Sequence, residues 1–180
     1  MLPQTLLLGA PLILLLGAAA VVDVRERRIP NWLTLGLAVL GLAQSFMPHR
    51  LVDPPEAIIG LLVGFALGLV LLLLGGMGGG DLKLIAAVGA WIGAIQVLWV
   101  FAICAIVAML MAIVGALTRG QARALVASTA ALAVQIVHAK RLNAVGEEAD
   151  EFRSVGKPLP FAVPMLLATA FVLLGLPLLK

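Results

Sequence analysis

The sequence predicts an all-α, polytopic membrane protein with six transmembrane helices, in a single domain over residues 1–180. Of the 180 residues, 63% are hydrophobic and 12% are charged, and the mean hydropathy is +1.17. Ordinary soluble domains are about half apolar and about a quarter charged. Long apolar runs also recur along the chain, and a helix that crosses a bilayer needs about 20 mostly apolar residues. Composition and pattern together exclude an ordinary soluble domain.

The apolar runs give the positions of the six spans. The run from Leu84 to Leu117 has no charged residue. As one helix it would be about 50 Å long, against a hydrocarbon core of about 30 Å. It is therefore expected to fold as two spans with a turn near 93–96. The other four spans are expected at Leu6–Val22, Trp32–Met47, Ala57–Leu74 and Pro160–Leu176.

The basic residues give the expected orientation. With six spans, all of the 12 Lys and Arg residues except Arg50 and Lys180 lie on one side. Cytoplasmic loops carry an excess of Lys and Arg, so this side is expected to be cytoplasmic, with both termini outside. With five spans, the basic segment from Arg119 to Lys157 would lie outside, which the rule disfavours.

Three other features of the sequence permit a different interpretation. The pI of about 9.6 suits a nucleic-acid binder, but membrane orientation explains most of the basic residues, so no nucleic-acid partner is expected. The small residues at 18–20 imitate a signal-peptidase site, but a signal peptide carries its positive charge before the apolar stretch, and here Arg25 follows it. The single cysteine, Cys104, can form neither an intrachain disulfide nor a zinc site.

The segment 119–157 combines an amphipathic stretch with a polar linker. Leu125, Leu132 and Ile136 fall on one helical face, and basic residues flank both ends of the stretch. This pattern is typical of a helix that lies along the membrane surface. We therefore expect an interfacial cytoplasmic helix here rather than a seventh span.

Two of the nine acidic residues are incompletely explained as solvated loop charges. Asp23 closes the first span, at the C-terminal end of its helix, where a negative charge opposes the macrodipole and neighbouring arginines offset this only in part. Asp81 precedes the fourth span, where it either acts as an N-cap or carries chemistry. Both aspartates are expected at the cytoplasmic rim, so they can approach each other if the first and fourth spans pack together.

A pair of aspartates has a specific chemistry. When two carboxyl groups share a site, one pKa rises and the pair holds one proton. The ionised member takes a proton from water while the protonated member polarises a peptide carbonyl, as in aspartic proteases, with no metal or cofactor. The glycines of segment 75–80 permit positive φ angles and the close approach of an extended substrate. A simple interhelical turn is the alternative, and the spacings of phosphate-binding loops are absent.

At this point the sequence resembles a known family. The stretch from Gly78 to Asp81 matches the GxGD motif of membrane-embedded aspartic proteases, and GGGDLK matches its form in type IV prepilin peptidases. In that family the other catalytic aspartate follows the first span, ahead of a basic turn and an Ile-Pro-Asn element, as Asp23 does here. The stretch Lys157–Pro164 is similar to the family's proline-containing start of the last span. The supporting motif residues are Ile29, Pro30, Asn31, Gly78, Gly79, Gly80 and Lys83.

The resemblance implies an intramembrane aspartic endopeptidase with Asp23 and Asp81 as its catalytic pair. Such an enzyme cleaves the leader from prepilin-like substrates at the cytoplasmic face of the bacterial inner membrane. Its substrate presents a short basic leader and then an apolar helix lodged in the bilayer, and no metal or cofactor is implied. The large members also carry paired Cys-x-x-Cys motifs and methylate the new N-terminus. With one cysteine, this chain instead resembles the short peptidases of Flp-type (tight-adherence) pilus systems, so methyltransferase activity is not expected.

Other functions stay open at the level of sequence. A proton- or ion-coupled transporter or channel would use the two aspartates as ion sites, but they lie at one rim and no inverted repeat is visible. An inactive scaffold with the peptidase fold is a further alternative, but it would not need to retain both aspartates. Lys83 can tune the aspartates, reach lipid phosphate or snorkel. His49 and His138 lack partners at metal-ligand spacing, and Trp91, Trp99 and Phe101 are expected to pack or to anchor at the interface.

Overall fold

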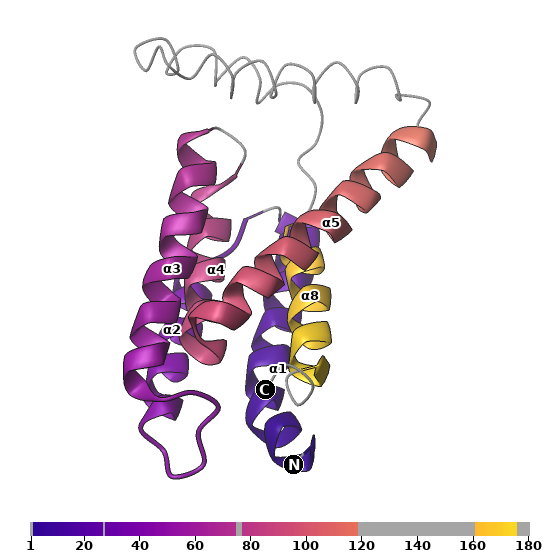
Figure 1. The fold of residues 1–180 in the computed structure, drawn as a ribbon. Coiled ribbons are helices and arrows are strands. Elements are labelled where there is room, and N and C mark those ends of the chain that lie inside the picture. The colour runs from indigo at the N-terminus through magenta and orange to yellow at the C-terminus, as the bar shows by residue number, and fades with distance from the viewer. Residues whose placement is uncertain (1, 27, 75–76, 119–160, 176–180) are drawn as a thin grey trace. The chain divides into compact units, whose positions relative to one another are not determined.

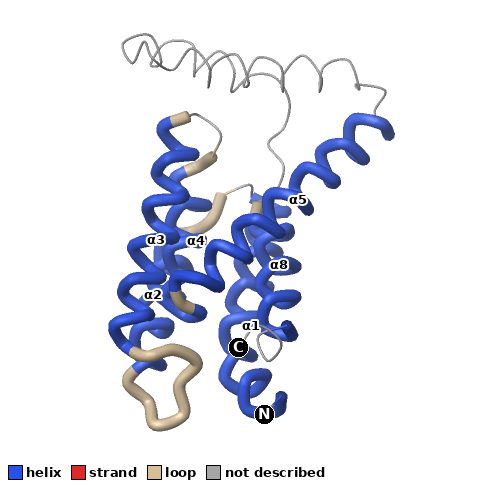
Figure 2. The backbone as a smooth tube through the Cα atoms, viewed as in Figure 1, coloured by secondary structure: helices blue, strands red, loops and turns tan. Residues whose placement is uncertain are grey.

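The computed structural model describes residues 2–26, 28–74, 77–118 and 161–175 (Figure 1). All regular structure in these residues is α-helical, as predicted (Figure 2). The interfacial helix and linker predicted for 119–157 lie outside them. The helices are α1 (Leu2–Glu26), α2 (Asn31–Ser45), α3 (Pro54–Leu73), α4 (Gly79–Ile92), α5 (Ala94–Thr118) and α8 (Ala162–Gly175).

The chain divides into two compact units, and the boundary between them falls within α5. The first unit comprises Met1–Val107 together with Pro160–Lys180, and the second comprises Ala108–Leu159. In the first unit, α4 packs between α2 and α3, and α1 packs against α8. In the second unit the described residues are the last turns of α5. The single domain over 1–180 stays a prediction.

Helix α4 is the core helix of the first unit. Every residue from Leu84 to Ile92 is buried, as expected for a helix that is apolar on all sides. The helix ends at Gly93, whose φ of +87° lies in the left-handed region that favours glycine. Helix α5 starts at the next residue, so the turn predicted near 93–96 is confirmed.

Helix α3 meets α4 through Gly60, Gly64 and Gly68, which lie on one helical face because they are four residues apart. A Cβ atom on Gly64 would lie 2.7 Å from the carbonyl oxygen of Ile85, and one on Gly68 would lie 2.9 Å from the Cα of Leu82. Small residues at this spacing let two membrane helices touch backbone to backbone. These three glycines therefore fix the position of α4 along α3.

Trp91 joins α4 to α2 by hydrogen bonds. Its Nε1 donates to the carbonyl oxygen of Leu37 at 2.7 Å, and its own carbonyl oxygen accepts from Gln44 Nε2 at 3.3 Å. Gln44 Oε1 in turn accepts from the backbone amide of Leu51 at 3.1 Å. Trp91 is only 3% exposed, so its predicted role in packing is confirmed. Trp99 is 52% exposed, as an interface anchor would be.

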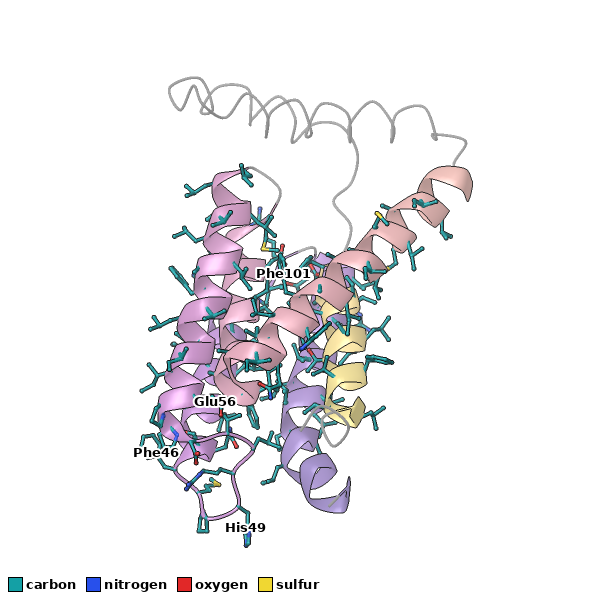
Figure 3. The ribbon with its side chains drawn as sticks, in the orientation of Figure 1. Phe46, His49, Glu56 and Phe101 are labelled. Atoms are coloured by element: carbon teal, nitrogen blue, oxygen red, sulfur yellow. The ribbon has the colours of Figure 1, made fainter. Side chains whose placement is uncertain are left out.

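Polar residues lie at the end of the first unit where α2 connects to α3, beside the exposed side chains of Phe46 and Met47. Figure 3 shows His49 in this connection and Glu56 in the first turn of α3. His49 is exposed, and Arg50 pairs with Asp53 across three residues. His138 lies outside the described residues. This polar end is opposite to the end where the predicted site residues lie.

The structure corrects the number of transmembrane helices. Among the described residues, three helices are long and apolar enough to cross a membrane: Leu8–Glu26 in α1, Pro54–Leu73, and Ala94–Val114 in α5. For the part of the chain that the structure describes, the prediction of six spans is therefore wrong. Helices α2 and α4 have 15 and 14 residues, and they rise only about 22 and 21 Å against a hydrocarbon core of about 30 Å. The charge pattern that favoured six spans carries no information about helix length.

We expect Gly64→Leu to destabilise the protein by about 1–3 kcal/mol, because the added side chain must force α3 and α4 apart. The matched control is Gly36→Leu, since a Cβ atom on Gly36 would meet nothing within 4 Å. Unfolding in detergent micelles, followed by circular dichroism, gives the free energy of unfolding of each variant. Equal stability of the two variants would contradict the role given to the α3 glycines.

Candidate active site

Four helix ends meet at one end of the first unit. They are the C-terminus of α1 and the N-termini of α2, α4 and α8. The Asp23 carboxylate at the end of α1 accepts a hydrogen bond from the Ala162 amide at the start of α8, with a donor–acceptor distance of 3.0 Å. The Lys83 ammonium of α4 donates to the Asn31 side chain of α2 at 2.8 Å. Segments far apart in the sequence thus bring the predicted site residues to one place.

Asp23 lies in the last turn of α1 and is 6% exposed. Its partner Ala162 is the first residue of α8. The first amides of a helix have no acceptor within that helix, and the helix dipole is positive at this end. The carboxylate of Asp23 therefore stabilises the N-terminus of α8, although it opposes the dipole of its own helix. This long-range compensation is what the sequence alone did not reveal.

Asp81 lies in the first turn of α4 and is half-buried. Its Oδ2 accepts a hydrogen bond from the amide of Gly78, the N-cap residue, at 3.3 Å. This is one half of a capping box, because glycine has no side chain with which to return the second bond. The alternative that Asp81 is itself the N-cap is wrong. Its carboxylate nevertheless satisfies one free amide of the helix start.

The electrostatics of the site centre on Asp81. Its pKa is raised from the ordinary value of 3.8 to about 6. Burial is the largest cause, the negative charge of Asp23 raises the pKa further, and the hydrogen bond from Gly78 lowers it. The two aspartates therefore interact through their charges. Within the described residues, each carboxyl group accepts its hydrogen bond from a backbone amide rather than bonding to the other.

The glycines before Asp81 differ from expectation. Gly78 is extended, with a φ of −82°, and Gly79 and Gly80 already belong to the first turn of α4. The positive φ angles that the sequence suggested are therefore not found at these three glycines. A Cβ atom on Gly80 would lie 3.2 Å from the Cβ of Ile29. The segment that closely approaches Gly80 is therefore the Ile29 turn of the same chain, where the sequence suggested an extended substrate. A Cβ atom on Gly79 would meet nothing within 4 Å, which leaves this side of the turn open.

The Ile-Pro-Asn element shapes the start of α2. Pro30 is the N-cap residue, with a φ of −64°, and its carbonyl oxygen accepts the amides of Leu33 and Thr34. Asn31 is the first residue of the helix and receives the hydrogen bond from Lys83. The sequence pattern gives no sign that the two motifs touch. Ala162 is a site residue that the motifs do not mark individually, although it lies in the proline-containing stretch Lys157–Pro164.

This arrangement has the elements of proton-transfer chemistry. Burial and the nearby negative charge of Asp23 let the Asp81 carboxyl group keep a proton to a higher pH than an ordinary aspartate does. A pKa of about 6 for Asp81 keeps both forms accessible near neutral pH. The described residues contain no group of three His, Cys, Asp or Glu side chains placed to hold a metal ion. The absence of a cofactor stays a prediction.

The raised pKa of Asp81 predicts a pH-dependent stability. Because the folded pKa of about 6 exceeds 3.8, the native state binds more protons than the unfolded state between these values. The protonated Asp81 side chain therefore contributes to the free energy of unfolding. This contribution is fully present below about pH 4 and is lost as the pH rises through 6. Relative to Asp81→Asn, the wild type should lose up to about 3 kcal/mol of unfolding free energy over this range. Unfolding in detergent micelles from pH 3.5 to 7.5 measures the difference.

The control for that experiment is Glu26→Gln, which removes an exposed carboxylate from the same end of the unit. Its unfolding free energy should follow that of the wild type across the whole pH range. If Asp81→Asn and the wild type changed in parallel with pH, the burial and charge effects assigned to Asp81 would be wrong.

The chain was compared with known proteins. It matches the type IV leader peptidase family over residues 10–115, a range that includes both aspartates. Over 78 residues it is 36% identical to the preflagellin peptidase of Methanocaldococcus jannaschii, which covers 41% of this chain and 33% of that protein. Over 116 residues it is 34% identical to the prepilin leader peptidase/N-methyltransferase of Xanthomonas campestris pv. campestris, which covers 61% of this chain and 40% of that protein.

The chain thus spans two fifths or less of the length of these two relatives. No solved structure gives a significant match. The family match, however, extends over more than half of the chain and contains three of the four helix ends that form the site, while the start of α8 lies outside it. On this basis the chain belongs to the type IV leader peptidase family.

Proposed function

We propose that this chain is an aspartic endopeptidase that removes the leader peptide from prepilin-like membrane proteins, with Asp23 and Asp81 as its catalytic pair. The observation that carries the proposal is the convergence of these two acids from α1 and α4, where the charge of one raises the pKa of the other. Membership of the family and the names of both relatives support this activity and this class of substrate.

The proposed reaction uses one proton shared by the pair. A water molecule attacks the scissile carbonyl carbon while the ionised carboxylate takes its proton, and the protonated carboxyl donates to the carbonyl oxygen. The resulting tetrahedral intermediate breaks down when the C–N bond cleaves and the leaving nitrogen takes up a proton. The amides of Ala162 and Gly78 hold the two carboxyl groups in place, which lowers the entropic cost of reaching the reactive geometry.

The surroundings of the site suit a substrate anchored in the membrane. The turn before Asp81 is open at Gly79, so an extended segment can pass there without displacing a side chain. The apolar helix of a prepilin-like substrate would lie in the bilayer beside the unit, with its scissile bond at the level of the aspartates. Its basic leader would extend into water.

The distribution of charge supports a site on the cytoplasmic side of a bacterial inner membrane. Arg25, Arg28 and Lys83 are exposed at the end that carries the aspartates, whereas Arg50 is exposed at the opposite end. An excess of basic residues marks the cytoplasmic side of a membrane protein. Three helices long enough to span the bilayer are consistent with a multi-pass protein.

The test is cleavage of a prepilin-type and a preflagellin-type substrate, each co-expressed with the protein. Asp23→Asn and Asp81→Asn should each lower processing at least about 100-fold, because an amide can neither accept the proton of water nor share one. The matched control is Asp53→Asn, whose exposed side chain lies at the opposite end of the unit and should leave processing unchanged. Substrate size on a gel and the amount of each variant in the membrane are the readouts.

Full processing by either Asn variant would refute the aspartate pair. If the wild type accumulated in the membrane and cleaved neither substrate, the transporter and the inactive scaffold would become the better hypotheses.

A further inference from the structure

The two motifs of the site touch each other at points that involve neither aspartate. Lys83 Nζ donates a hydrogen bond to Asn31 Oδ1 at 2.8 Å, between side chains 52 residues apart in the sequence. A few residues away, a Cβ atom on Gly80 would lie 3.2 Å from the Cβ of Ile29 and 3.5 Å from its carbonyl oxygen. The first turn of α4 is therefore in contact with the turn that connects α1 to α2.

The packing of the helices explains why these contacts matter. Helix α1, which carries Asp23, packs mainly against α8, whereas α4, which carries Asp81, packs against α2 and α3. The two aspartates therefore lie on helices that are not each other's main neighbours. The connecting turn follows Asp23 by only six residues at Ile29, so a contact between this turn and α4 links the two aspartates by a short path.

Lys83 is badly placed to act on the aspartates directly. It follows Asp81 by two residues, and side chains at this spacing do not face each other on a helix. Its side chain is exposed, and its partner is the neutral amide oxygen of Asn31 rather than a carboxylate. The hydrogen bond holds the lysine ammonium against the Asn31 side chain at the protein surface.

We propose that Lys83 and Asn31 form a tether that holds the first turn of α4 against the turn after α1 and so sets the position of Asp81 relative to Asp23. Both are positioning residues and neither touches the substrate. The effect on catalysis rests on the proposed function, but the effect on geometry does not. The tether makes three predictions that a role in substrate binding or in electrostatic tuning does not share.

The first test is kinetic. Lys83→Met and Asn31→Leu remove the hydrogen bond with little change in side-chain size, and each should lower kcat about tenfold or more with little change in KM, because a small displacement of a reacting group is costly. The double variant should be no worse than either single one, since both remove the same interaction. Lys83→Arg, which can still donate to Asn31, should restore most of the activity.

The dependence of kcat on pH distinguishes the tether from an electrostatic effect of Lys83 on the aspartates. If Lys83 tuned the aspartates, Lys83→Met alone would shift the acid limb of the profile to higher pH, because it removes a nearby positive charge. The tether predicts the same unshifted acid limb for Lys83→Met and Asn31→Leu. An acid limb that moved only for Lys83→Met, or an Asn31→Leu variant with full activity, would overturn the tether.

The second test is independent of catalysis. Spin labels attached to Val24→Cys and Gly79→Cys, in a Cys104→Ala background, report the distance between the ends of α1 and α4, since both sites are exposed. Pulsed electron paramagnetic resonance should show a broader distance distribution for Lys83→Met and Asn31→Leu than for the parent, and a narrow one again for Lys83→Arg. Unchanged distributions in both variants would refute the tether, even if processing failed for another reason. Broadening without any processing by the wild type would keep the tether and refute the proposed function.

Discussion

Direct backbone contact between α3 and α4 is the constraint on which the rest of the unit depends. Within a bilayer the hydrophobic effect gives two apolar helices little reason to associate, so close packing has to supply the attraction. The glycines at 60, 64 and 68 remove the side chains that would hold the helices apart. Because α4 is buried on every side from Leu84 to Ile92, the packing of this stretch fixes where its N-terminal turn, with Asp81, lies.

The site itself illustrates how buried acids are accommodated at helix ends. Asp23 lies at the unfavourable end of α1, yet its carboxylate receives an amide from α8 and faces the positive end of that helix. Asp81 lies at the favourable end of its own helix but near another negative charge, and its pKa rises. The start of α8 thus stabilises the negative charge of Asp23, whereas Asp81 is left with a pKa close enough to neutral pH for it to exchange a proton there.

The sequence predicted the helical architecture because apolar runs and breaking residues are local signals. The turn at Gly93 and most of α3 follow from them directly. The number of spans does not follow from these signals. Charge in the loops constrains the orientation of the helices, whereas the length of a helix, such as the 14 residues of α4, decides whether it can cross the bilayer. The Gly60, Gly64, Gly68 spacing is visible in the sequence, but the spacing alone does not say which helix packs against these glycines. The contacts of Asp23 with Ala162 and of Lys83 with Asn31 depend on tertiary packing, which no local pattern encodes.

The hydrogen bond between Asp23 and Ala162 also has a consequence for biosynthesis. Its partners are 139 residues apart, and chains are made from the N-terminus onward. Asp23 therefore enters the membrane long before its amide partner exists, and it gains that partner only when α8 has been inserted. The site is completed only after α8 has been made, so a chain synthesised only as far as α5 has both aspartates but lacks the contact that holds one of them in place.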